Sequence, residues 1–236
     1  MLSLMRLELK RNKLRTYQLV TVATFLLVLG FTYLFAYVPQ FNPDDADLLL
    51  FAGYDNVLAL SILICMAVFC VLSSVMYARF IIDEYSGKRA TLLFSYPVSR
   101  RKVLLAKVLV VFLFNVIAML LCSVLALGIF SITEQFAPMV SDTLTAATLL
   151  QSMRNILIMA VIAPSLGVVA AGIGFIQKSV PTTIVSAVVM ISVLGNFMSG
   201  ALQNAAFSLV LLCISALAAA LTCGLLMGKV NTMEVE

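Results

Sequence analysis

The sequence predicts an all-α membrane protein with six transmembrane helices. Of its 236 residues, 63% are hydrophobic and only 11% are charged, and the mean hydropathy is +1.12. Six crossings of about 20 apolar residues each would leave about half of the chain for ends and loops. No alternating pattern of a membrane β-barrel is visible, so helices must satisfy the backbone inside the bilayer. A soluble domain is excluded, and we expect a single transmembrane domain over residues 1–236.

Six apolar runs, bounded by polar or turn residues, give the expected spans. They cover approximately residues 18–38, 56–78, 103–131, 155–176, 182–199 and 205–228. Each run is long enough to cross ~30 Å of hydrocarbon at about 1.5 Å per residue, although the fifth is near the short limit. The third is long, so we expect it to tilt or to begin in the interface. Segment 141–153 is either a short surface helix capped by Ser141 or a plain loop.

The basic residues give the expected orientation. Of the 15 Lys and Arg residues, all but Arg154 lie at four places on one expected side. They precede the first span, follow the sixth span, or lie in or next to two connections, the one between the second and third spans and the one between the fourth and fifth spans. The positive-inside rule places such connections in the cytoplasm. We therefore expect a multi-pass protein of the cell membrane with both termini cytoplasmic.

Residues 1–16 precede the first span and mix apolar side chains with five bases. Leu2, Met5 and Leu9 share a stripe at helical spacing, whereas Leu7 and Leu14 fall on the opposite side. We favour an N-terminal interfacial helix whose bases reach toward anionic headgroups. A solvated positive tail is the alternative, and both interpretations place this segment at the inner leaflet.

Composition removes most catalytic chemistry. His is absent, so imidazole metal centres and His-assisted nucleophiles are excluded within this chain. The five cysteines lie in apolar runs without Cys-x-x-Cys spacing, so no metal site is expected. Neither a Gly-x-Ser-x-Gly motif nor a nucleotide-binding Gly-x-x-x-x-Gly-Lys-Ser/Thr motif occurs; the nearest segment, Gly87-Lys88-Arg89, lacks the upstream Gly and the hydroxyl residue. We therefore expect a chain without catalytic residues or a cofactor of its own.

The connection between the second and third spans carries the strongest signal. Within its charged sequence lie Leu92, Leu93, Phe94 and Tyr96, followed by Pro97. Proline disfavours helical geometry at the residue before it, so a short helix is expected to end here. Large apolar side chains exposed on a charged loop are unfavourable unless headgroups or a partner cover them. An ordinary positive connector is the alternative, but it leaves the apolar residues unexplained.

This segment resembles the loop of type-2 ABC transporter permeases, the membrane subunits of ATP-driven exporters. In that loop an acid and a Gly precede a Leu-Leu pair, and a Pro-x-Ser-Arg step leads into the next helix, with a later Lys. The matching positions here are Glu84, Gly87, Leu92, Leu93, Pro97, Ser99, Arg100 and Lys107. The basic N-terminal segment, the six spans and the chain length also fit this family.

The resemblance implies that residues 84–96 form a cytoplasmic coupling helix seated in a groove of a separate ATPase subunit, which would hold ATP and Mg. It also implies that two permease subunits, identical or paralogous, pair to form the pathway. The residues expected to couple to the ATPase are Glu84, Gly87, Lys88, Arg89, Leu92, Leu93, Phe94, Tyr96, Pro97, Ser99 and Arg100.

Polar groups inside the spans are few and uncharged, which disfavours an ion-coupled secondary transporter. The pathway candidates are Thr21, Thr24, Asn115, Met190, Asn196 and Met198. Each candidate has an alternative role. The threonines would bond back to their own helix, Asn115 would form an interhelical hydrogen bond, and the methionines would serve in packing. An apolar pathway would suit hydrophobic or amphipathic cargo such as a drug, an antimicrobial peptide or a lipid.

Small residues mark two later spans. In the fourth they follow at spacings of three and four, as Ala163, Gly167, Ala170 and Gly174, and in the sixth Gly224 and Gly228 form a Gly-x-x-x-Gly pattern. Such stripes let helix backbones approach closely. We expect them to pack within the chain, with a subunit interface as the alternative.

The function predicted from these features is that of a permease subunit of an ATP-driven exporter. The alternatives are the membrane subunit of an importer or a small facilitator, and the direction of transport in vesicles would separate exporter from importer. An intramembrane enzyme is disfavoured because the residues for its chemistry are absent.

Overall fold

The computed structural model describes residues 5, 15–40, 53–84, 100–136, 139–140 and 145–232. All regular secondary structure in these ranges is helical. The long helices are α2 (Arg15–Tyr37), α3 (Tyr54–Tyr77), α5 (Arg100–Phe136), α6 (Ala146–Ile176), α7 (Val180–Gln203) and α8 (Ala205–Thr232). A 3-10 turn, η1 (Val38–Gln40), follows α2, and a π-helical segment, η3 (Ala78–Ile82), continues α3. Six of these helical segments are long and apolar enough to cross a membrane, so the predicted fold class is confirmed.

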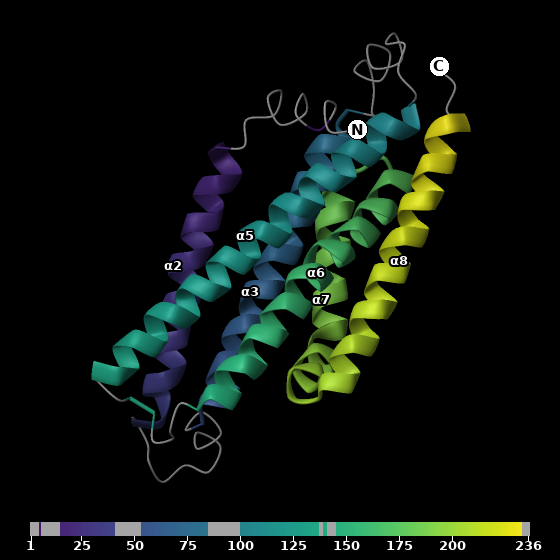
Figure 1. Cartoon of the computed structure of the whole chain (residues 1–236). Helices are drawn as coiled ribbons and strands as arrows, with labels where there is room; N and C mark the ends of the chain where they lie inside the picture. Colours follow the sequence, from purple (N-terminus) through teal and green to yellow (C-terminus); the bar gives the residue numbers. More distant parts are fainter. Residues whose placement is uncertain are drawn as a thin grey trace.

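Successive long helices run in opposite directions, and α2 begins at the same end of the bundle at which α8 ends (Figure 1). An even number of crossings requires this arrangement. We call the end where η3 stops and α5 starts the basic end. Its described bases are Arg15, Arg79, Arg100, Arg101, Lys102, Lys107, Lys178 and Lys229. We call the other end the opposite end, and it carries Glu134 and Arg154.

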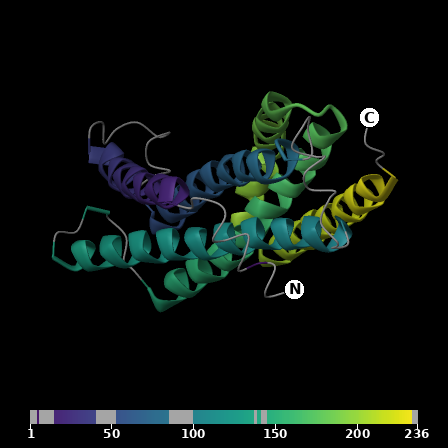
Figure 2. The same cartoon turned by 90° about the horizontal axis from the view of Figure 1, so that it is seen from above.

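Helix α6 lies at the centre of the bundle. It packs against α3, α5, α7 and α8, whereas α2 and α8 lie on opposite sides of the molecule (Figure 2). The outer faces of α2 and α8 expose large apolar side chains, among them Leu26 and Leu217. Such faces suit hydrocarbon as the surrounding medium, because a water-soluble chain rarely exposes apolar patches of this extent.

Two helices extend by five or more residues beyond one end of their predicted spans. The third span, predicted to end at residue 131, continues to Phe136. The fourth span begins at Ala146, with the Thr145 side chain accepting a hydrogen bond from the Thr148 N–H at 3.3 Å. A separate surface helix over 141–153 is therefore wrong, since residues 146–153 are the first two turns of α6. The cap predicted at Ser141 lies outside the described residues.

The small residues of α6 mark its close contacts. A Cβ added at Gly167 would collide with the hydroxyl of Ser73 and crowd the ring of Tyr77, and one at Gly174 would collide with Thr183. Packing within the chain is thus confirmed for these two glycines, because the neighbouring helices approach too closely for a side chain.

The small residues of α8 behave differently. Gly224 and Gly228 are exposed, and a Cβ added at either would have no neighbour within 4 Å. The expectation that they pack within the chain is wrong, because this face of α8 points away from α6.

Candidate functional site

The candidate site lies at the basic end, where η3 stops and α5 starts. These two elements bound the connection 85–99, which contains most of the residues predicted to couple to a partner. Glu84 is the second residue after η3, and Lys107 lies about two turns into α5. Although 23 positions apart, the two residues meet in the fold.

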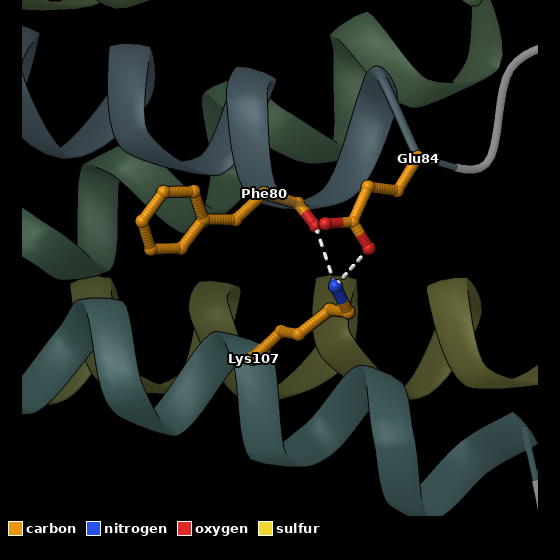
Figure 3. Close-up of polar contacts among 3 residues, drawn as sticks. All are labelled: Phe80, Glu84 and Lys107. Carbon is orange, nitrogen blue, oxygen red and sulfur yellow. Dashed lines mark hydrogen bonds and ion pairs between the residues drawn. The ribbon is translucent and has the colours of Figure 1, made fainter. Parts of the chain in front are cut away.

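Lys107 is held between a carboxylate and a backbone carbonyl. Its side chain is 0% exposed, and its ammonium forms an ion pair with Glu84, whose side chain is 17% exposed. The same ammonium donates a hydrogen bond to the carbonyl oxygen of Phe80 at 3.1 Å (Figure 3). A lysine is almost never fully buried without such partners. We call Phe80, Glu84 and Lys107 the clasp.

The position of Phe80 in the last turn of the helix explains why its carbonyl accepts a hydrogen bond from Lys107. In η3 the Asp83 N–H donates to the Ala78 carbonyl at 3.0 Å, a bond that spans five residues instead of four. The last carbonyls of a helix lack backbone donors and carry the negative end of the helix dipole. The ammonium of Lys107 is therefore placed where a positive charge stabilises the end of the helix.

Further polar contacts join the last turns of α3 to α5. The Tyr77 hydroxyl donates to the Val108 carbonyl at 3.5 Å, and both residues are buried. Deeper in the bundle, the Asn115 amide donates to the Val111 carbonyl at 2.8 Å and to the sulfur of Met76 at 3.5 Å. These contacts extend the attachment that begins at the clasp.

The comparison with protein families gives a match over most of the chain. Residues 4–195 match the model of the family described as ABC-2 family transporter protein. The chain belongs to the ABC-2 transporter family. This match covers the first four spans, most of the fifth and the whole connection between α3 and α5, so the resemblance seen in that connection is confirmed at the level of the family. Membership also implies association with ABC ATPases and with the membrane.

A relative is known from Bacillus subtilis (strain 168). The chain is 26% identical to the protein described as "Uncharacterized protein YcbO" over 199 aligned residues. The alignment covers 84% of this chain and 86% of the relative. No solved structure gives a significant match. The relative's name adds no activity, so the functional argument rests on the family and on the site.

The structure describes two of the residues predicted to couple this ABC-2 chain to an ATPase. Glu84 belongs to the clasp, and Arg100 is the first residue of α5. The others lie outside the described residues: Gly87, Lys88, Arg89, Leu92, Leu93, Phe94, Tyr96, Pro97 and Ser99. Most of the helix expected over 84–96 and of the interfacial helix expected over 1–16 lies there too.

The pathway candidates on α2 and α5 bond to helix backbone. Thr21 donates to the Tyr17 carbonyl at 3.0 Å, and Thr24 donates to the Val20 carbonyl at 2.8 Å. Asn115 is 0% exposed. These contacts match the alternative role given to each residue.

The candidates on α7 lie apart from one another. Met198 is buried, Met190 is half-buried against the core, and Asn196 is exposed. One cavity lies between α2, α3, α5 and α6, and another lies between α3 and α7. None of the six pathway candidates is among the described residues that line either of them.

A polar cluster at the opposite end was missed by the sequence analysis. The Glu134 carboxylate accepts hydrogen bonds from the Tyr54 hydroxyl at 2.8 Å and from the backbone N–H groups of Met139 and Val140 at 2.7 and 2.8 Å. The signal was an acid three residues beyond the predicted end of the third span. We call Tyr54, Glu134 and the two N–H groups the carboxylate cap.

Proposed function

We propose that this chain is the permease subunit of an ATP-driven ABC exporter. Two permease subunits, identical or paralogous, would form the pathway, and separate ATPase subunits would bind ATP and Mg. Family membership supports the transport role, and the absence of a nucleotide-binding motif in the sequence supports an ATPase on another chain. The ATPase would dock on the connection between α3 and α5 through Leu92, Leu93 and Phe94.

The clasp is the observation that carries this proposal. It ties the end of η3 to α5 through Lys107, next to the connection on which the partner would act. A displacement of that connection would therefore reach both helices together. Helix α3 also packs closely on the central helix α6, so the movement has a continuous packed route into the bundle.

The orientation and cargo of the exporter follow from charge and hydropathy. The basic end would face the cytoplasm of a cell membrane, with both termini on that side. The absence of a charged pathway candidate supports hydrophobic or amphipathic cargo, such as a drug, an antimicrobial peptide or a lipid.

The first experiment removes the apolar docking surface. A tagged chain is purified from its native membrane, and the co-purified ATPase is recognised by its nucleotide-binding motif. We expect Leu93→Asp to lower ATPase recovery by at least about tenfold, because a charge in an apolar groove costs more than about 1.4 kcal/mol. Ser95→Asp is the matched control, since it adds the same charge to the same segment without removing an apolar side chain.

Normal ATPase recovery with Leu93→Asp, at unchanged membrane insertion, would contradict the docking assignment. Recovery lost equally in Leu93→Asp and Ser95→Asp would point to general charge sensitivity of the segment instead. Direction is tested separately, by ATP-dependent accumulation of cargo in inside-out vesicles. Release rather than accumulation there would favour an importer subunit.

A further inference from the structure

A cavity opens at the opposite end of the bundle, far from the clasp. Its volume is about 230 Å³, and it lies between the first turns of α3 and the last turns of α7. The residues that line it are Asn56, Ala59, Leu60 and Leu63 from α3 and Ser199, Leu202 and Gln203 from α7. Ser199 and Gln203 are exposed, so the cavity communicates with the surface through α7.

Along α3 the lining changes from polar to apolar with depth. Asn56 and Gln203 lie within one turn of a helix end, at the level where a span leaves the hydrocarbon. Leu63 lies seven positions beyond Asn56 along α3, which places it about 10 Å deeper. The amides of Asn56 and Gln203 are thus at interfacial depth, and Leu60 and Leu63 are at the depth of acyl chains.

A hydrogen bond from α6 holds the α7 wall of the cavity in place. The Asn155 side-chain amide on α6 donates a hydrogen bond to the Leu202 carbonyl at 2.9 Å, and both residues are buried. This bond holds the last turn of α7 to the central helix. The cavity therefore does not close by a simple inward shift of α7, because Asn155 and the carbonyl would lose their partners.

The size and the apolar, uncharged lining of the cavity indicate which kind of ligand fits it. Water needs two to four polar partners, which the deep leucines do not offer, whereas an apolar cavity of about 150 Å³ already accepts a small hydrocarbon. None of the seven lining residues is charged, so recognition would rest on hydrogen bonds at the rim. Ester carbonyls are neutral acceptors that suit the hydroxyl and amide donors of Ser199 and Gln203.

We propose that this cavity binds a glycerolipid of the adjoining leaflet, with one acyl chain between α3 and α7 and the ester region at Ser199 and Gln203. Because the lining carries no charge, the site does not select the headgroup. This proposal is independent of the ATPase partner and requires only that the chain lies in a bilayer.

The test uses the full chain in phosphatidylcholine vesicles. A photoactivatable acyl probe is introduced on phosphatidylcholine or on phosphatidylglycerol, and cross-linked peptides are mapped by mass spectrometry. We expect cross-links to concentrate on residues 56–63 and 199–203, to a similar extent for both lipids. Leu63→Trp should reduce them about tenfold, since a bulky side chain fills the acyl position and removes contacts worth about 1.4 kcal/mol.

Two further variants keep the result decisive. Leu217→Trp adds the same ring to an exposed position of α8 and should leave the cross-links unchanged. Ala59→Leu fills the same cavity with a smaller side chain, which serves if Leu63→Trp fails to fold. The proposal is overturned by cross-links spread evenly over all exposed helix faces, by cross-links that survive in both filling variants, or by labelling that requires one headgroup.

Discussion

Each end of the bundle holds a carboxylate bonded near one end of α5, and the two carboxylates have different kinds of partner. At the basic end Glu84 pairs with a full positive charge on Lys107. At the opposite end the described partners of Glu134 are all neutral, being a tyrosine hydroxyl and two backbone N–H groups on one carboxylate oxygen. The clasp joins two helices across a long connection, whereas the carboxylate cap joins the last turn of α5 to Tyr54 and to the backbone at Met139 and Val140.

This difference predicts how each end fails. In the clasp, removing one partner takes away the opposite charge with which the other is paired, so the loss should be nearly complete in a single step. In the carboxylate cap each donor contributes separately, so losses should be graded. A cooperative attachment suits an element that must move as one with its neighbour, and a graded one suits an element that only ends a helix.

The largest effect is expected in the clasp. Glu84→Ala leaves the ammonium of Lys107 buried without its counter-charge and should lower the free energy of unfolding by about 3–5 kcal/mol. Lys107→Met should cost less, because the Glu84 side chain is 17% exposed and can turn toward water. Denaturant unfolding in detergent micelles measures both.

A double-mutant cycle sharpens this test. The double variant Glu84→Ala with Lys107→Met should be much more stable than the sum of the single losses, because no unpaired charge remains. Lys102→Met is the control, since Lys102 is an exposed base on the same helix, and no measurable change is expected. Strictly additive losses would show that the pair does not act as a unit.

The next effect is expected in the carboxylate cap. Glu134→Ala removes the acceptor of three donors, and we expect a loss of about 2 kcal/mol, with interfacial water replacing part of the bonding. Glu134→Gln should cost less, because its amide oxygen still accepts. Hydrogen exchange at the Met139 and Val140 amides should accelerate in Glu134→Ala.

The neighbouring exposed residue provides the control for the cap. Gln135→Ala should leave both stability and exchange unchanged, since Gln135 lies on the outer surface of α5. If Glu134→Ala destabilised the chain as much as Glu84→Ala, the contrast between a cooperative and a graded end would be lost.

The sequence predicted the six spans because hydropathy is a property of each segment alone. It misplaced the end of the third span, because Glu134 reads as a loop residue until its donors are known. The start of the fourth was misplaced for a related reason: a segment such as 146–153, which contains Thr148, Gln151 and Ser152, continues a helix when one face packs on the bundle. Tertiary partners decide both boundaries.

At the site, too, the sequence predicts individual residues but not their contacts. Glu84 and Lys107 were picked out by their resemblance to a family pattern, but their contact depends on how η3 and α5 meet. The Phe80 carbonyl is missed because it is a backbone group in the last turn of a helix, and its residue type does not reveal it. Similar spacing of small residues gave close packing at Gly167 and an open face at Gly224, because spacing does not state which face meets a neighbour.

The smallest effect is expected when one tyrosine hydroxyl is removed at either end of the bundle. Tyr54 donates to the Glu134 carboxylate at 2.8 Å, whereas Tyr77 donates to a neutral carbonyl at 3.5 Å. We expect Tyr54→Phe to cost about 1.5 kcal/mol and Tyr77→Phe about 0.5 kcal/mol, since bonds to charged groups are stronger and long bonds are weak. Both rings stay in place, so unfolding measurements report the hydroxyl alone. Equal costs would mean that the carboxylate adds nothing to the Tyr54 bond, and that the basic end depends on its hydroxyl as well as on its ion pair.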